Sequence, residues 1–214
     1  DPAAPTLTNE VTTIAAFDPD VFISMTAGNP CLLAIQEVEA SGLYDRLSAA
    51  FTPSVCKGIA AYLAPAGMAA DGYWIVGGGA KDTTDSGKMD EPFIAFARDL
   101  ISDAGEDAGI SLTGEGVFRG YAFTEAFRIA DALPGGMSRT NLMLALRNFK
   151  IYHPGLLDGL VTELKGNADA YFVEGSEYSK FNATDQTWEM VGDVVDANGG
   201  TPNCRWDKAN GGCR

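Results

Sequence analysis

The sequence predicts an α/β fold in which helices flank a parallel sheet, and three observations support this class. Apolar runs at residues 21–25 and 72–76 have the composition of buried strands. A helical pattern of apolar residues fills 30–41, between the two runs. Strands that alternate with helices favour a parallel sheet, because each helix returns the chain to the end where the next parallel strand begins.

The other elements of the first 79 residues follow from local signals. Asp18-Pro19-Asp20 ends a helical stretch over 11–17. Pro30 suits the first turn of the helix over 30–41, and Gly42 suits its C-cap. The remaining elements expected here are a weaker strand that ends near Phe51, a helix over 54–63 that stops before Pro65, and the strand over 72–76.

A change of pattern after the third strand predicts a boundary. The glycines at 77–79 and the polar stretch at 81–90 have the composition of a flexible crossing between substructures. Helices are then expected over 93–104, 120–132 and 139–148, the last with Ser138 as its N-cap. From 151 onward only short apolar pieces remain, with strand-like stretches at 170–173 and 188–195, so we expect the chain to cross back.

The charge balance and the motifs exclude several classes of function. Fifteen basic residues against 29 acidic residues give a net charge of −14, which repels nucleic acids and anionic lipid surfaces. The single histidine, His153, argues against a histidine-based zinc site, and without a nucleophile motif we expect it to be structural. No phosphate-binding loop or metal-binding motif is present, so we expect no cofactor, no metal and no enzymatic activity.

Three closely spaced acidic pairs are candidates for paired carboxylates of the glycosidase type. They lie in polar stretches of an acidic chain, so we expect them to be solvated surface groups. The pairs are Asp18 and Asp20, Asp82 and Asp85, and Glu174 and Glu177.

The four cysteines fit two disulfides, because their number is even and no CxxC motif is present. Cys204 and Cys213 enclose a polar, glycine-rich tail that has almost nothing apolar to bury and would need a covalent staple. This indicates an oxidising compartment; the alternative is four reduced thiols in a cytosolic protein.

No apolar run reaches the roughly 18 residues of a membrane span. The first ten residues lack the features of an export signal, so we expect a soluble chain from which any such signal has been removed.

Small polar residues follow two successive predicted strands. Open α/β sheets bind ligands at the carboxyl ends of their parallel strands. Either loop alone is equally well explained as an ordinary helix cap or turn, but the two together, at neighbouring strand ends, predict a binding cleft. The residues are Thr26, Ala27, Gly28 and Asn29 in the first loop, and Phe51, Thr52, Pro53 and Ser54 in the second.

The order of the segments resembles the latter half of a type I periplasmic substrate-binding protein, the Leu/Ile/Val-binding type that feeds ABC importers. The matching pieces are FDPDVFISMTAGNPCLLAIQEVEASGL, GMAADGYWIV, FIAFARDL, GYAFTEAFRIADAL and a final region containing Phe-Asn and Trp-Glu-Met-Val. Members of this family have two lobes joined by three crossings, so the resemblance implies a fragment that lacks the amino-terminal halves of both lobes. It assigns 1–79 to the second lobe, 80–150 to the first lobe, and 151–214 to the return crossing and the end of the second lobe with its disulfide tail.

The resemblance also implies where a ligand would bind. Residues 26–29 and 51–54 would line the cleft from the second lobe, and Phe118, Arg119 and Tyr121, near a helix start, would face it from the first. Amino-acid-binding relatives usually have an acidic residue in the second loop, which here is FTPSVC, and this departure disfavours an amino acid. A carboxylate on an aromatic or apolar body is then expected, with Arg119 as its partner.

Two further expectations depend on the resemblance. Cys31 and Cys56 each begin one of two successive helices, which suits a disulfide beside the cleft and leaves Cys204 to pair with Cys213. The function implied is capture of a small solute in the periplasm or outside the cell, for delivery to an ABC permease. The full-length form is then expected to be anchored to the membrane as a lipoprotein. The alternatives are a sensory receptor domain of the same fold, an amino-acid binder, or, in another class, an enzyme on an α/β scaffold.

Overall fold

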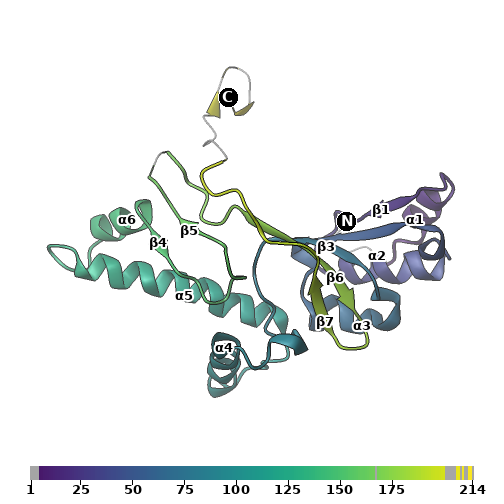
Figure 1. The fold of residues 1–214 in the computed structure, drawn as a ribbon, viewed down its shortest axis with the longest axis horizontal. Coiled ribbons are helices and arrows are strands. Elements are labelled where there is room, and N and C mark those ends of the chain that lie inside the picture. The colour runs from purple at the N-terminus through teal and green to yellow at the C-terminus, as the bar shows by residue number, and fades with distance from the viewer. Residues whose placement is uncertain (1–4, 167, 201–205, 208, 210–211, 214) are drawn as a thin grey trace.

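The computed structural model describes residues 5–166, 168–200, 206–207, 209 and 212–213. They form a sheet covered by helices and, beside it, a group of three further helices (Figure 1). The elements that build the sheet and its cover are α1 (Thr8–Ala15), β1 (Val21–Ile23), α2 (Asn29–Ala40), β2 (Ala49–Pro53), α3 (Ala64–Ala66), β3 (Trp74–Gly77), β6 (Gly175–Asn182) and β7 (Thr187–Met190). The others are α4 (Pro92–Asp103), α5 (Ser111–Ala132), α6 (Arg139–Arg147), and the short strands β4 (Lys150–Ile151), β5 (Thr162–Glu163), β8 (Val195–Asp196), β9 (Trp206–Asp207) and β10 (Gly212–Cys213).

The main sheet has the strand order β1-β2-β3-β6-β7, and β8 also pairs with β6. Strands β1, β2 and β3 are parallel, as the sequence predicts, whereas β6 and β7 are antiparallel to their neighbours. The strand expected at 170–173 is wrong, because only an isolated bridge joins Val173 to Thr162 and β6 begins at Gly175. In β6 buried and exposed residues alternate, and the buried ones include the polar Glu177 and Ser179, so this strand lacks a continuous apolar run that the sequence could reveal.

The main core lies on one face of this sheet, where the first three helices pack (Figure 1). Val38 of α2 and Leu63 before α3 are fully buried there, and so is Ile75 of β3. Burial of each such side chain stabilises the fold by about 1.5–3 kcal/mol. This side of the sheet fixes the positions of the loops that follow β1 and β2.

The helix expected over 54–63 is interrupted. Ser54–Cys56 forms one 3₁₀ turn, and Ile59–Leu63 forms a π-helical turn that leads into α3. Gly58 separates the two turns with a non-helical backbone, and a side chain there would press on Ser111, since an ideal Cβ would lie 3.1 Å from its Cβ. Pro65 does not stop this segment, because it occupies the first turn of α3, where its missing N–H costs nothing.

Helix α5 begins nine residues earlier than the expected start at residue 120. Phe118, Arg119 and Tyr121 therefore lie inside the helix and not near its start, which corrects the prediction. Glycine is a poor helix former, but Gly114 is needed for packing, because a Cβ there would come within 2.1 Å of the Thr83 hydroxyl. Ser138 caps α6 as predicted, with its hydroxyl accepting a hydrogen bond from the Asn141 N–H at 3.1 Å.

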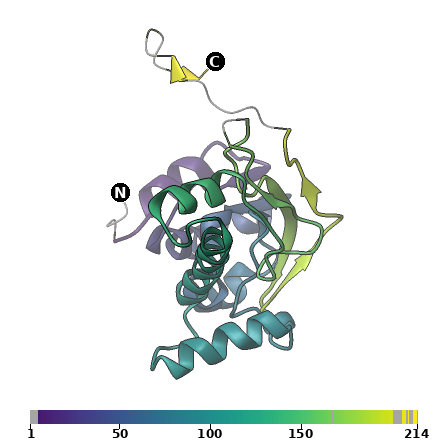
Figure 2. The same cartoon turned by 90° about the vertical axis from the view of Figure 1, so that its left-hand side faces the viewer.

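Two segments connect the sheet to the group of α4, α5 and α6, and they lie side by side. The Lys81 N–H donates to the Gly155 carbonyl at 2.9 Å, and the Leu157 N–H donates to the Gly79 carbonyl at 2.8 Å. Figure 2 shows α5 nearly end-on beside these segments. Within the described ranges, no helix is long and apolar enough to cross a membrane.

Candidate ligand-binding site

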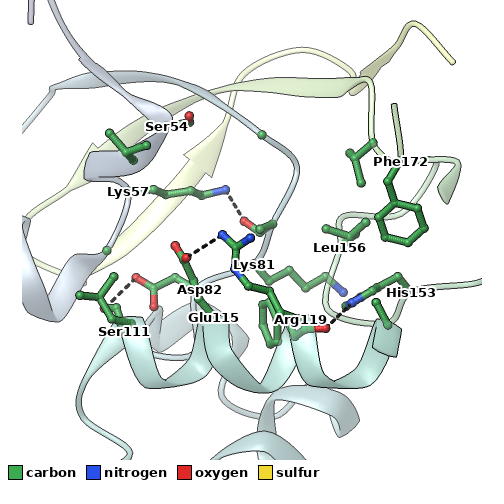
Figure 3. Close-up of a pocket in the computed structure, with 18 of the residues that line it drawn as sticks. Ser54, Lys57, Lys81, Asp82, Ser111, Glu115, Arg119, His153, Leu156 and Phe172 are labelled. Atoms are coloured by element: carbon green, nitrogen blue, oxygen red, sulfur yellow. Dashed lines mark hydrogen bonds and ion pairs between the residues drawn. The ribbon is translucent and has the colours of Figure 1, made fainter. Parts of the chain in front are cut away.

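A cavity of about 710 Å³ lies where the sheet and the helices α5 and α6 meet (Figure 3). Its polar wall comes from the loops after β1, β2 and β3 and from the first turns of α5. Its apolar wall comes from the middle of α5, the end of α6 and the returning segment. The polar residues that line it are Ser54, Lys57, Lys81, Asp82, Ser111, Glu115, Arg119 and His153, and the apolar ones include Phe118, Phe123, Leu146, Phe149, Leu156, Leu164, Phe172 and Val173.

Lys57 forms a buried ion pair with Glu177 of β6 at the sheet side of the cavity. Its ammonium also donates to the Ala80 carbonyl at 2.7 Å. The second carboxylate oxygen of Glu177 accepts from the Gly79 N–H at 2.7 Å. Gly77 leaves the space that this carboxylate fills, because an ideal Cβ there would lie 1.9 Å from it. The ammonium of Lys57 is therefore held at the cavity wall by two separate segments of the chain, the stretch around Ala80 and strand β6.

Asp82 joins the π-helical turn to α5. Its carboxylate accepts from the Ile59 N–H at 2.6 Å and from the Thr84 N–H at 2.9 Å, and the Ser111 hydroxyl lies 3.4 Å away. Burial raises the pKa of the neighbouring Asp85, although backbone N–H donors of Gly87 and Trp188 oppose this.

The expectation of solvated acidic pairs is therefore wrong at three positions. Asp82, Asp85 and Glu177 are buried because each accepts hydrogen bonds from the backbone. These backbone donors come from elsewhere in the fold or from local turns, so the spacing of the acidic residues gave no sign of them.

Lys81 is buried at the same wall but is already paired. Its ammonium lies 2.5 Å from a carboxylate oxygen of Glu91, and it also donates to the Pro154 carbonyl at 3.4 Å. Burial alone would raise the pKa of Glu91, but the hydrogen bond and the charge of Lys81, together with Lys88, outweigh it and lower that pKa.

Arg119 is the cation of the cavity with the most freedom. Its side chain is 77% exposed, and it pairs with Glu115, at 3.4 Å on the preceding turn of α5. Figure 3 shows its guanidinium reaching into the space below Lys57. An exposed pair of this length contributes little, so most of the guanidinium donors are available to a ligand.

His153 holds the aromatic part of the cavity in place. One ring nitrogen donates to the Phe118 carbonyl at 2.9 Å, and the other accepts from the Gly155 N–H at 3.2 Å. Its ring contacts those of Phe118 and Tyr121, with centroids 6.1 and 5.1 Å away. Burial lowers the pKa of His153 despite the bond to Phe118, so the neutral imidazole fits this position and its expected structural role.

The far end of the cavity is apolar. Phe149, after α6, stacks on Phe172 of the returning segment with ring centroids 5.3 Å apart. The Leu164 N–H donates to the Phe149 carbonyl at 2.6 Å, which fixes the spacing of these two segments. Figure 3 places Phe172 and Leu156 at the opposite side of the cavity from Ser54 and Asp82. The cavity thus has a charged end and an aromatic end.

The structure brings four of the ten predicted ligand residues to this cavity, namely Gly28, Ser54, Phe118 and Arg119. The other six lie elsewhere. Thr26 forms a hydrogen bond with the Ser24 hydroxyl at 2.7 Å, and the ring of Phe51 lies 6.2 Å from that of Trp74. Thr52 is buried in the sheet, and Tyr121 packs on His153. Ala27 and Asn29 flank Gly28 without lining the cavity.

No local pattern in the sequence indicates the side chains that complete the site. Lys57, Lys81, Asp82, Phe149 and Phe172 come from separate segments, and no motif links them. The run of glycines at 77–79 was the nearest signal. Its composition predicts a flexible crossing, and in the structure Gly77 ends β3 and the Gly79 N–H donates to Glu177.

The expected disulfide between Cys31 and Cys56 is present, with the two Cα atoms 5.6 Å apart. It is fully buried and ties the first turn of α2 to the turn at Ser54–Cys56. These are the two segments that bring Gly28 and Ser54 to the cavity. The expected pairing of Cys204 with Cys213 lies outside the described residues.

No protein-family model and no curated protein matches this sequence. Solved structures match its fold. A branched-chain amino acid ABC transporter from Thermus thermophilus with bound valine superimposes with a TM-score of 0.73 at 14% identity, over 89% of this chain and 49% of that chain. A solute-binding protein of an ABC transporter from Rhodopseudomonas palustris HaA2, in complex with p-hydroxybenzoic acid, gives a TM-score of 0.65 at 13% identity, over 92% and 50%.

A third structure is the leucine-, isoleucine-, valine-, threonine- and alanine-binding protein from Brucella ovis in a closed conformation. It gives a TM-score of 0.63 at 16% identity, over 94% of this chain and 49% of that chain. The chain thus spans about half the length of the structures that it matches. These likenesses confirm the resemblance predicted from the order of the segments: the chain has the α/β fold of the type I periplasmic binding proteins of ABC transporters.

Proposed function

We propose that this chain belongs to an extracytoplasmic solute-binding protein that takes a small carboxylate with an aromatic or apolar body and delivers it to an ABC permease. The observation that supports this best is the division of the cavity into a charged end and an aromatic end. A ligand with one anionic group and an apolar body complements both ends. The proposal includes no catalytic step and no cofactor.

Arg119 is the proposed partner of the ligand carboxylate. Lys57 and Lys81 are each bound to a carboxylate of the protein and to a backbone carbonyl, so they offer few free donors. A guanidinium gives two parallel hydrogen bonds to a carboxylate, and a long exposed pair with Glu115 is easily exchanged for them. The two other cations add positive potential at the same wall.

An α-amino acid fits this site less well. Its ammonium needs an acceptor, but Asp82 is occupied by backbone N–H donors and Glu177 by Lys57 and Gly79. The carboxylate of Glu115 remains as an acceptor for the ammonium, but it lies on the same helix face as Arg119 and pairs with it. The matched structures hold both kinds of ligand, valine in one and p-hydroxybenzoic acid in another, so the ligand must be decided by the side chains of this chain.

The proposed location outside the cytoplasm is supported by the buried disulfide, since such bonds persist in oxidising compartments. Anchoring as a lipoprotein and docking to a permease are part of the same proposal. Amino-terminal segments of the same protein are proposed as a further partner.

The test is calorimetric titration of the native protein with p-hydroxybenzoate and with valine. We expect the aromatic acid to bind more tightly, and Arg119→Ala to weaken its binding about tenfold or more. Arg128→Ala is the matched control, because Arg128 lies on the same helix and pairs with Glu125 but does not line the cavity. Tighter binding of valine, or equal effects of the two substitutions, would overturn the proposal.

A further inference from the structure

Asn198 and Gly199 form a dipeptide whose side chain and backbone can react with each other. The backbone nitrogen that follows an asparagine can attack the side-chain amide carbon and close a five-membered ring. Glycine at the second position favours this attack, because it has no Cβ to block the approach. The chain has this dipeptide twice, each time within the sequence Ala-Asn-Gly-Gly, at 197–200 and at 209–212. Asn210 and Gly211 of the second copy lie outside the described residues.

The fold holds Asn198 in a tight turn after β8. The Asp196 carboxylate accepts from the Asn198 N–H at 3.0 Å, and the Gly200 N–H donates to the Ala197 carbonyl at 2.6 Å. Gly199 has a φ of 73°, in the left-handed region that favours glycine. Asn198 is half-buried and Gly199 is exposed, so water reaches the dipeptide.

The carboxylate of Glu174 lies against the nitrogen that has to react. One of its oxygens accepts from the Gly199 N–H at 2.6 Å. The other oxygen is buried and has no hydrogen-bond partner in the part of the chain that the structure describes. The backbone carbonyl of Glu174 accepts from the Ala197 N–H at 3.3 Å, which fixes this residue beside the turn. A buried carboxylate oxygen without a partner is rare in folded proteins and needs an explanation.

The side-chain amide of Asn198, which has to leave, lies beside a second pair of charged groups. Its nitrogen donates to a carboxylate oxygen of Glu163 at 3.5 Å, and the Lys165 ammonium lies 3.1 Å from the same oxygen. An ideal Cβ on Gly199 would lie 3.9 Å from that ammonium. The long hydrogen bond orients the amide, and the ammonium adds a positive charge beside the departing nitrogen.

We propose that Asn198 is a self-modification site at which Glu174 acts as the general base. The carboxylate takes the proton of the Gly199 N–H while this nitrogen bonds to Cγ of Asn198. The bond from Cγ to Nδ2 then breaks, and Nδ2 leaves as ammonia with the proton that Glu174 had taken. Water opens the ring and gives aspartate or isoaspartate, so the net reaction consumes one water molecule and releases one ammonia. This inference does not depend on the proposed function.

The product changes how the turn is joined to the returning segment. Asp196 accepts from the Val161 N–H at 2.7 Å, and Asn198 donates to Glu163, so the turn and this segment are now held together. The new carboxylate repels that of Glu163, and isoaspartate also lengthens the main chain of the turn by one carbon atom. Leu164 of the same segment lines the cavity. The modification is therefore a slow, irreversible change beside the apolar end of the cavity.

The test is incubation of the native protein and of Glu174→Gln at neutral pH, followed by peptide mass spectrometry. We expect the substitution to slow the conversion of Asn198 about tenfold or more, because an amide cannot take the proton. Asn210 has the same neighbours in the sequence and gives the reference rate in each sample, which should not change. Glu189→Gln is the matched control, because it removes an exposed carboxylate of β7 and should leave both rates unchanged.

The pH profile distinguishes a general base from a merely structural contact. A carboxylate is already ionised at neutral pH, whereas the concentration of hydroxide rises steeply with pH. Between about pH 6 and 8 we expect a nearly constant rate at Asn198 in the parent and a rising rate in Glu174→Gln. The hydrogen bond from Lys165 lowers the pKa of Glu163, so this neighbour also stays ionised over the range. The charged groups of the neighbouring elements that face the turn are Lys150, Glu163, Lys165 and Asp196.

Three results would overturn the proposal. The first is an equal or faster conversion of Asn198 in Glu174→Gln with a circular dichroism spectrum like that of the parent, because the bond to Glu174 would then be neutral or protective. The second is a parent rate that rises in proportion to hydroxide, which decides the matter even if the variant fails to fold. The third is the absence of conversion at Asn198 while Asn210 reacts.

Discussion

The ammonium of Lys57 and the carboxylate of Glu177 form a buried ion pair, although 120 residues separate them in the sequence. The pair joins the turn after β2 to the antiparallel strand β6, and the same carboxylate holds the Gly79 N–H. Three segments that enter and leave the sheet are thereby fixed at one point beside the cavity. The pair also connects the site to the stability of the fold.

Replacement of Glu177 by Gln should destabilise the protein. It leaves the ammonium of Lys57 without its counter-ion in a buried position, and removal of one partner of such a pair costs about 3 kcal/mol or more. Urea unfolding measures this loss. Glu189→Gln, an exposed carboxylate on β7, is the control and should change the free energy of unfolding by less than about 0.5 kcal/mol. If the two variants unfold at the same urea concentration, the ion pair does not stabilise the fold.

Gly77→Ala and Gly78→Ala form a matched pair of neighbours. The added methyl group at residue 77 meets the Glu177 carboxylate, whereas at residue 78 nothing lies within 4 Å. We expect the first substitution to cost about 1–3 kcal/mol through overpacking and the second to be nearly neutral. Thermal unfolding followed by circular dichroism distinguishes them. Equal melting temperatures would show that the carboxylate moves aside without cost.

Removal of the disulfide in a Cys31→Ala/Cys56→Ala double variant should lower the free energy of unfolding by roughly 3 kcal/mol, because the bond closes a loop of 25 residues in the unfolded chain. It should also weaken ligand binding, since the bond fixes the segments that bring Gly28 and Ser54 to the cavity. Denaturant unfolding and calorimetry measure the two effects. Mass spectrometry after alkylation without reductant checks the native state; alkylation at Cys31 or Cys56 would contradict the assignment.

Acid should destabilise the protein through His153. Burial lowers the pKa of this imidazole in the folded state below the ordinary value of 6.5, so the unfolded chain binds the proton more tightly. The contribution of this group is fully present above the unfolded pKa and is lost as the pH falls below it. Between about pH 7.5 and 5.5 the wild type should therefore lose more stability than His153→Gln. Parallel losses in the two proteins would show that the imidazole is not shielded from water.

The local elements of this chain were predictable because their signals are local. The apolar run of β1 and the hydroxyl of Ser138 at the start of α6 each act within a few residues. The order of these elements was enough to identify the fold. The disulfide between Cys31 and Cys56 followed from the same order, because each cysteine lies in the helix or turn that follows one of two neighbouring parallel strands.

Only the tertiary structure decided which side chains form the site. Asp82 and Glu177 belong to polar stretches whose composition is typical of solvated surface, yet both are buried, because backbone N–H groups from distant segments converge on them. Gly114 reads locally as a helix breaker, but the close approach of Thr83 requires it. Burial and hydrogen bonding of a side chain depend on which segments the topology brings beside it, and the residues next to it in the sequence contain no record of those segments.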